Sequence, residues 1–284
     1  MKSVMAKTQD GTITLNISIP SDVVKKAWEE ELEKVVEQAE LPGFRKGKAP
    51  KKAVEEKLDK AKLQEDVLRK LLPKAYSDAV TEHNLKPVIN PKIHVDPSTF
   101  SGQEKWMFTA TTCETPEVKL NNYKEKVKQI TSKSKIIVPG KDLPAGRQGD
   151  VAPNMDDIVK ALLEEVNVTV PQVLADSETE RLLVQLLDEI KTLGLTLDQY
   201  LSSTHRTIED VKKEYATRAT NDISFEFALQ KIAEEEKISV EPKEIDEALQ
   251  KAKDEEERKN LEKNVYLLAS ILRQQKTLDF LKNL

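Results

Sequence analysis

The stretch TITLNISIP, residues 12–20, decides the fold of the first part of the chain. Apolar and polar residues alternate through it, which is the pattern of a strand with one buried face. The apolar side chains of that face are Ile13, Leu15, Ile17 and Ile19. Pro20 ends the strand because proline cannot donate a backbone hydrogen bond. The sequence therefore predicts a strand over 12–19 that packs one face into a core.

A helix is predicted directly after this strand. Ser21 has a side-chain oxygen of the kind that caps helix N-termini. Apolar residues then recur at helical spacing until the segment 41–43, where a proline and a glycine end the helix. The residues of this apolar stripe are Val24, Trp28, Leu32, Val35 and Ala39. The stripe predicts that the helix packs on the apolar face of the strand.

The following segments complete an α+β pattern. Helical periodicity runs over residues 53–83 and is interrupted or kinked at Pro73. Two strand-like segments follow, over 88–95, where Pro91 favours a sheet edge, and over 106–113. These segments predict a small antiparallel sheet backed by helices.

Composition and charge narrow the class of protein. The chain has 284 residues, of which 38% are hydrophobic and 33% charged, and this composition favours a mostly helical, soluble, globular protein. A net charge of −5 excludes a wholly basic surface for nucleic acid. A single cysteine, Cys113, excludes an internal disulfide and a zinc cluster. With no signal-peptide pattern and no apolar run long enough to span a membrane, the sequence predicts a cytoplasmic protein.

A change of composition marks the domain boundary. After residue 118 the chain becomes Lys-rich and then rich in Gly and Pro. We therefore predict one domain over 1–118, a flexible linker over 119–156, and a second domain over 157–284. The segment 143–149 has neither periodicity nor caps, and no role beyond that linker follows from its residues.

The second domain is predicted to be all helical. Ser177 with Glu180 has the spacing of a capping box at a helix start, and Gly194 is placed to end the same helix in a left-handed conformation. Thr207, with an acidic residue at the capping-box position, predicts the start of a second long helix. A third helix is expected after Pro242, and a last one runs to the end of the sequence.

A basic and aromatic loop is the most informative motif. The stretch LPGFRKGKAP, residues 41–50, carries two glycines and two prolines that favour a tight loop between two helices. Phe44 lies in it beside Arg45, Lys46 and Lys48. Such a loop can pair with phosphates or acidic side chains while the ring fills a pocket. The alternative is a solvated turn with Phe44 folded back on the core.

The sequence GFRKGKAP in this loop resembles the signature loop by which trigger factors dock on the large ribosomal subunit. The segment from Lys86 to the strand at Trp106 is similar to the rest of that family's ribosome-binding domain. The stretch VPQVLADSE, residues 170–178, is similar to the start of its helical chaperone domain. The resemblance therefore covers most of the chain.

This resemblance implies an ATP-independent chaperone that docks at the ribosomal exit tunnel, on ribosomal protein and RNA, and holds nascent polypeptides. It implies no cofactor, no DNA and no membrane partner, and it leaves a weak homodimer open. The implied ribosome contacts are Gly43, Phe44, Arg45, Lys46, Gly47 and Lys48.

The sequence departs from the family in one respect. Trigger factors usually carry an FKBP-type prolyl-isomerase domain between these two parts, and here the predicted linker stands in its place, with Tyr123 as its only aromatic residue. Because a proline-binding pocket needs several converging rings, the sequence predicts no enzyme activity. Two alternatives remain: a holdase or assembly chaperone that works off the ribosome, and a peptidyl-prolyl isomerase as the family name would imply.

The client-binding residues are expected among apolar side chains of the predicted C-terminal helices. The candidates are Leu187, Leu193, Leu201, Phe225, Phe227, Tyr266 and Phe280. A chaperone needs exposed apolar surface, whereas ordinary core packing is the alternative for each of them. The three histidines, His83, His94 and His205, lack metal-ligand spacing, and neither a metal site nor a catalytic constellation is predicted.

Overall fold

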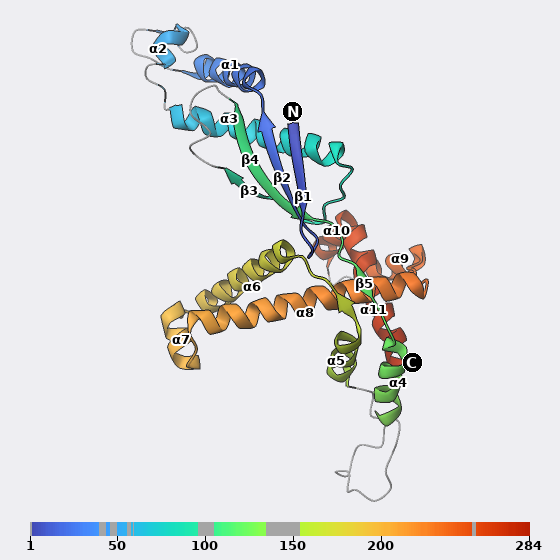
Figure 1. The fold of residues 1–284 in the computed structure, drawn as a ribbon. Helices are drawn as coiled ribbons and strands as arrows, with labels where there is room; N and C mark the ends of the chain where they lie inside the picture. The colour runs from blue at the N-terminus through green and yellow to red at the C-terminus, as the bar shows by residue number, and fades with distance from the viewer. Residues whose placement is uncertain are drawn as a thin grey trace, which may run out of the picture. The chain divides into compact units, whose positions relative to one another are not determined.

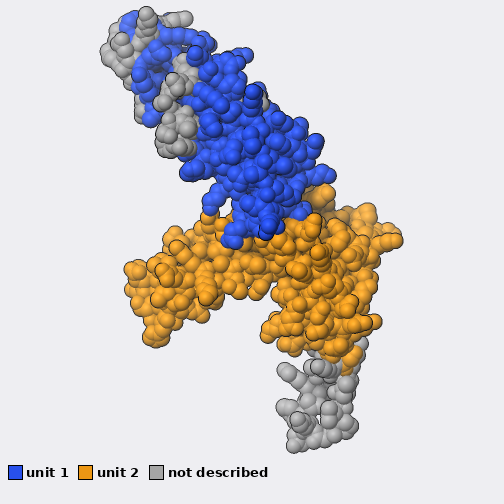
Figure 2. Space-filling model, in the orientation of Figure 1, with its two compact units in different colours: residues 1–115, 171–174 blue, residues 116–170, 175–284 orange. Residues whose placement is uncertain are grey.

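The protein divides into two compact units, which are coloured separately in Figure 2. The computed structural model describes residues 2–39, 44–45, 50–55, 58, 60–95, 105–134, 154–251 and 254–284. Unit 1 comprises residues 1–115 and 171–174, and unit 2 comprises 116–170 and 175–284. Unit 1 contains a sheet with helices and unit 2 is almost entirely helical (Figure 1), so the predicted fold class is confirmed.

Unit 1 is built on a four-stranded antiparallel sheet in the order β1-β2-β4-β3. The strands are β1 (Lys2–Lys7), β2 (Thr12–Ile19), β3 (Lys92–Val95) and β4 (Trp106–Cys113). The two central strands, β2 and β4, have the bounds that alternation predicts, and their register places Leu15 opposite Ala110. One face of both strands is therefore buried throughout.

Helices α1 (Ser21–Gln38) and α3 (Lys60–Glu82) pack on that face. Their side chains and those of the sheet form one core, whose buried members are Ile13, Leu15, Ile17, Ile19, Val24, Ala27, Val67, Leu71, Ala75, Ala79, Trp106, Phe108 and Ala110. Pro20 takes the N-cap position of α1 and no side chain caps the helix, so the prediction that Ser21 is the cap is wrong. Proline's restricted φ suits this extended position, and Ser21 becomes the first helical residue.

The predicted helix over 53–83 is two helices, α2 (Lys51–Glu55) and α3. Pro73 lies inside α3 and does not interrupt it. Proline costs the helix one hydrogen bond, but the neighbouring buried residues Leu71 and Ala75 hold both sides of it against the sheet. Packing therefore overrides the local preference of proline.

The outer strands differ from the prediction. Strand β3 occupies only Lys92–Val95, at one edge of the sheet. The chain before it does not continue the strand, although the N–H of Val88 donates to the carbonyl of Cys113 at 3.0 Å. Strand β1 was not predicted. Its residues lack an apolar alternation, and it forms because pairing with β2 satisfies its backbone groups.

Unit 2 begins at residue 116, and its first strand and helix include residues that the sequence analysis assigned to the linker. Strand β5 (Val118–Lys119) pairs with β6 (Asn167–Val168), and helix α4 (Tyr123–Ser134) packs against α5 (Met155–Glu165). Residues 119–134 are thus ordered in the core of unit 2, because Tyr123 and Val127 are buried against α5. The rest of the predicted linker up to residue 153, with the segment 143–149, lies outside the described residues.

Three helices follow: α6 (Gln172–Thr192), α7 (Leu197–Thr204) and α8 (Ile208–Glu235). Helix α6 begins at Gln172, so the prediction that Ser177 opens it is wrong. Pro171 precedes this start, and a carboxylate distant in sequence caps it, as described below. Gly194 has the predicted left-handed conformation, with φ of 72°, and Thr207 forms the predicted capping box with Asp210.

The chain then forms α9 (Pro242–Gln250), α10 (Glu255–Lys263) and α11 (Val265–Lys282). The main core of unit 2 has the buried residues Leu120, Tyr123, Val127, Ile158, Leu162, Ala228, Leu229, Ile232 and Leu281. A smaller core between α6 and α8 contains Leu186, Ile190 and Val211. Helix α11 packs on α8 along only part of its surface, which leaves other apolar side chains exposed.

Candidate functional site

The predicted docking loop lies between α1 and α2. Phe44 is 48% exposed and Arg45 is exposed, and neither belongs to the core of unit 1. The alternative in which Phe44 folds back on the core therefore does not describe this structure. The other predicted contacts lie outside the described residues: Gly43, Lys46, Gly47 and Lys48.

An ion pair anchors the loop where α2 begins. The Lys51 ammonium lies 2.6 Å from a Glu33 carboxylate oxygen on α1. This hydrogen bond is the main cause that raises the pKa of Lys51 above its ordinary value. Both side chains are more than half exposed, so the pair orients the start of α2 more than it stabilises the fold.

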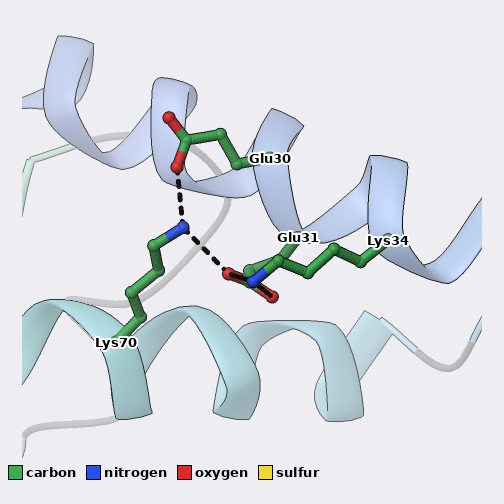
Figure 3. Close-up of polar contacts among 4 residues, drawn as sticks. All are labelled: Glu30, Glu31, Lys34 and Lys70. Carbon is green, nitrogen blue, oxygen red and sulfur yellow. Dashed lines mark hydrogen bonds and ion pairs between the residues drawn. The ribbon is translucent and has the colours of Figure 1, made fainter.

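A second polar cluster joins α1 to α3 (Figure 3). Lys70 on α3 donates to Glu30 at 2.6 Å and to Glu31 at 3.0 Å, and Lys34 donates to Glu31 at 2.8 Å. The hydrogen bond from Lys34 is the largest cause that lowers the pKa of Glu31. The hydrogen bond that Lys70 donates to Glu30 is the largest cause that raises the pKa of Lys70. This charge network links α1, the helix that leads into the loop, to α3.

The predicted client-binding residues fall into two groups. Leu187, Leu193 and Tyr266 are exposed, and Leu193 and Tyr266 expose 74% and 94% of their surface. Phe225 and Phe280 pack against the main core of unit 2, Leu201 packs against the smaller core, and Phe227 is half-buried. The structure therefore leaves the first group available to a partner.

An exposed apolar ridge on α11 was only partly anticipated. The α11 ridge consists of Tyr266, Leu267 and Ile271, while their neighbour Leu268 is buried. Residues 265–268 are all apolar, and four consecutive helical residues cannot share one face. That run was the signal in the sequence for Leu267 and Ile271, which were not among the predicted client-binding residues.

Two grooves flank the α11 ridge within unit 2. One, of about 570 Å³, lies between α8 and α11 and is lined by Leu229, Ala233, Ile238, Val240, Tyr266 and Arg273, among others. The other, of about 370 Å³, lies between α10 and α11 and is lined by Leu261, Leu267, Leu268 and Ile271 together with polar residues. Their mixed apolar and polar lining suits weak contacts with extended chain segments.

Cys113 is a free, buried cysteine at the end of β4. Burial raises the pKa of the Cys113 thiol to about 11, so it stays protonated at neutral pH. Among the described residues, no group of three or more His, Cys, Asp or Glu could hold a metal ion. Within the same part of the chain, no helix is long and apolar enough to cross a membrane.

Curated relatives resemble part of the chain. It is 39% identical to the trigger factor of Natranaerobius thermophilus over 124 residues, which are 44% of this chain and 27% of that protein. It is 36% identical to the trigger factor of Staphylococcus aureus (strain JH9) over 124 residues, 44% of this chain and 28% of that protein. The matched region thus spans about a quarter of the length of these relatives.

A solved structure supports the fold along the whole chain. The structure described as "Promiscuous Substrate Recognition in Folding and Assembly Activities of the Trigger Factor Chaperone" matches with a TM-score of 0.66 and covers 100% of this chain and 99% of that one. Its sequence identity of 14% makes this a likeness of fold alone.

Family models account for both units. The model for "Bacterial trigger factor protein (TF)" matches residues 1–139, and the model for "Bacterial trigger factor protein (TF) C-terminus" matches residues 153–284. Only residues 140–152 lie between the two matches. Because both matches name the same family and follow one another along the chain, this chain belongs to the trigger factor family.

Proposed function

We propose that this chain is an ATP-independent molecular chaperone of the cytoplasm that docks at the ribosomal exit tunnel and holds nascent polypeptides. The observation that carries the proposal is the exposure of Phe44 and Arg45 in the loop between α1 and α2, while a charge network links α1 to α3. An exposed ring beside a cation is suited to a surface of ribosomal protein and RNA, where the ring is buried and the cation faces phosphate or carboxylate.

The holding activity rests on unit 2. The α11 ridge and Leu193 expose apolar surface that a folded monomer would ordinarily bury. Apolar segments of an unfolded chain gain by covering this surface and leave it when burial inside their own fold is more favourable. Such a cycle needs no nucleotide, and weak contacts give the fast release that it requires.

The proposal includes no prolyl-isomerase activity. Residues 140–152 are the only ones between the two family matches, and an isomerase domain of roughly a hundred residues does not fit there. A proline-peptide isomerisation assay tests this part separately, and turnover above the uncatalysed rate would contradict it.

Ribosome docking is tested by co-sedimentation at low and moderate salt. The variant combines Phe44→Ala, Arg45→Ala and Lys46→Ala. The wild type should pellet with ribosomes, and less of it should do so as salt rises, because the cationic contacts are screened. The triple variant should stay in the supernatant.

A matched control removes the same kinds of side chain elsewhere on unit 1. Met107→Ala, Lys25→Ala and Lys74→Ala delete one exposed apolar side chain and two exposed cations and should leave pelleting unchanged. If the wild type never pellets, or if the loop variant pellets as well as the control does, ribosome docking fails. The leading function would then be a holdase or assembly chaperone off the ribosome.

A further inference from the structure

Strand β1 ends the sheet of unit 1 and has one unpaired side. It pairs with β2 in an antiparallel register, and β3 lies at the opposite end of the sheet (Figure 1). No other strand among the described residues pairs with β1. The side of β1 that faces away from β2 is therefore an open edge, which is the usual place where a sheet accepts an additional strand.

The register identifies which backbone groups point outward from this edge. The N–H of Thr8 donates to the carbonyl of Thr12, which marks the hydrogen-bonded kind of residue pair at the hairpin end. Because such pairs alternate in an antiparallel ladder, Ala6, Val4 and Lys2 direct their backbone groups toward β2. The N–H and C=O groups of Ser3, Met5 and Lys7 consequently point away from the sheet.

The side chains of β1 are apolar in the middle and cationic at the ends. Val4 is 66% exposed and Met5 is 40% exposed, and they point to opposite faces of the sheet because they are adjacent in a strand. Lys2 and Lys7 stand at the two ends, and Lys7 lies 3.5 Å from Glu114. A strand added here would find an apolar neighbour on each face and a lysine at each end, of which Lys7 is shared with Glu114.

The lysines of β1 indicate which kind of strand can pair with this edge. A second copy of β1 paired antiparallel through the same outward groups would place Met5 opposite Met5, and Lys7 of each copy opposite Ser3 of the other, next to its Lys2. Each end of the pair would then carry two lysines. Like charges gathered at the ends of a strand pair repel one another, and edge lysines commonly prevent self-association of this kind. A segment with apolar residues in its middle and acidic residues at its ends has the complementary pattern.

We propose that β1 binds an extended segment of another polypeptide as a fifth strand of the sheet, and that segments with an apolar middle and acidic ends bind best. The main-chain hydrogen bonds of such pairing are independent of sequence, so the edge accepts many partners and the lysines supply the preference. This surface belongs to unit 1 and includes neither Phe44 nor any residue of the α11 ridge, so it goes beyond the proposed function.

The test reads the exchange of backbone amides with solvent, by NMR on the isotope-labelled full-length chain. The probe is an end-blocked peptide Glu-Val-Thr-Ile-Val-Glu. When about nine-tenths of the chain is bound, exchange at Ser3, Met5 and Lys7 should slow about tenfold, because only the free fraction exchanges. The same peptide with lysine in place of glutamate should bind more weakly.

Two variants test the geometry and the charge. Met5→Pro removes an outward N–H, a position where an edge strand tolerates proline, and it should abolish the slowing at Ser3 and Lys7. Val4→Thr is its control, since it keeps the outward groups and should retain the slowing. Lys2→Glu should reverse the preference in favour of the lysine peptide.

Three results would overturn the proposal. The first is unchanged exchange at these three amides at about 1 mM peptide, the limit of a weak specific contact. The second is slower amide exchange that is confined to unit 2. The third is slowing that grows with protein concentration in the absence of peptide, which would assign the edge to a second copy of this chain. None of these readouts involves the ribosome or Phe44, so failure here is distinct from failure of docking.

Discussion

The carboxylate of Asp10 accepts a hydrogen bond of 2.8 Å from the backbone N–H of Gln172, the first residue of α6, which is 162 positions away in sequence. Asp10 lies in the turn between β1 and β2, where it also accepts hydrogen bonds from the hydroxyl groups of Thr8 and Thr12. An N-terminal N–H that has no partner inside its own helix is thereby satisfied by a side chain distant in sequence.

Replacing Asp10 with alanine should lower the free energy of unfolding by about 1–2 kcal/mol, the usual loss when a helix N-terminus is left uncapped. Both tryptophans, Trp28 and Trp106, belong to unit 1, so their fluorescence during urea denaturation reports on this unit. Glu37→Ala, at an exposed position on α1, is the control and should change stability by less than about 0.5 kcal/mol. Equal stability of the two variants would contradict a capping role.

The same carboxylate should make stability depend on pH in the acid range. The hydrogen bond from Thr8, followed by that from Gln172, holds the pKa of Asp10 well below its usual range. The stabilisation is complete above the unfolded pKa of about 3.9 and is lost as the pH falls below it toward the folded value. The difference in unfolding free energy between wild type and Asp10→Asn should therefore shrink as the pH falls from about 4 to about 2. A difference that is constant over that range would refute the assignment.

Lys237 and Gly194 both have left-handed backbone conformations at helix ends, and substitutions at these two positions should change stability in opposite directions. Lys237 follows α8 with φ of 55°, where the N–H of Ile238 donates to the carbonyl of Ala233 at 2.8 Å. Glycine adopts this conformation without strain, so Lys237→Gly should stabilise unit 2 by about 0.5–1 kcal/mol. Gly194→Ala, at φ of 72°, should destabilise it by a similar amount. Thermal denaturation followed by circular dichroism measures both, and shifts of the same sign would contradict this reasoning.

Two adjacent leucines of α11 allow client binding and stability to be tested separately, because Leu267 is exposed and Leu268 is buried. Leu267→Ser changes a side chain that is 62% exposed and should alter stability by less than about 0.5 kcal/mol, while it weakens suppression of aggregation of an unfolded protein. Its neighbour Leu268 is buried, and Leu268→Ala should cost about 2–4 kcal/mol through the cavity that it leaves. If Leu267→Ser suppresses aggregation as well as the wild type does, the ridge is not a client surface.

Local patterns predicted the parts of this protein whose causes are local. The alternation at Trp106, Phe108 and Ala110 depends only on the two-residue period of a strand, and those three side chains are buried together in unit 1. Gly194 and Thr207 act within one turn of the helix ends that they mark, so each was recognised from its own neighbours. Phe44 is exposed, as the sequence predicted for the loop between two helices.

The sequence by itself thus determined the central strands, most helices and the existence of the basic loop. Only the tertiary structure decided that Lys2–Lys7 forms an edge strand and that Asp10 starts α6 at Gln172, because both depend on partners distant in the chain. It also decided that Phe225 packs against a core while Tyr266 is exposed to solvent. Both are aromatic residues on helices, and their different exposure follows from which face of each helix a neighbouring element covers.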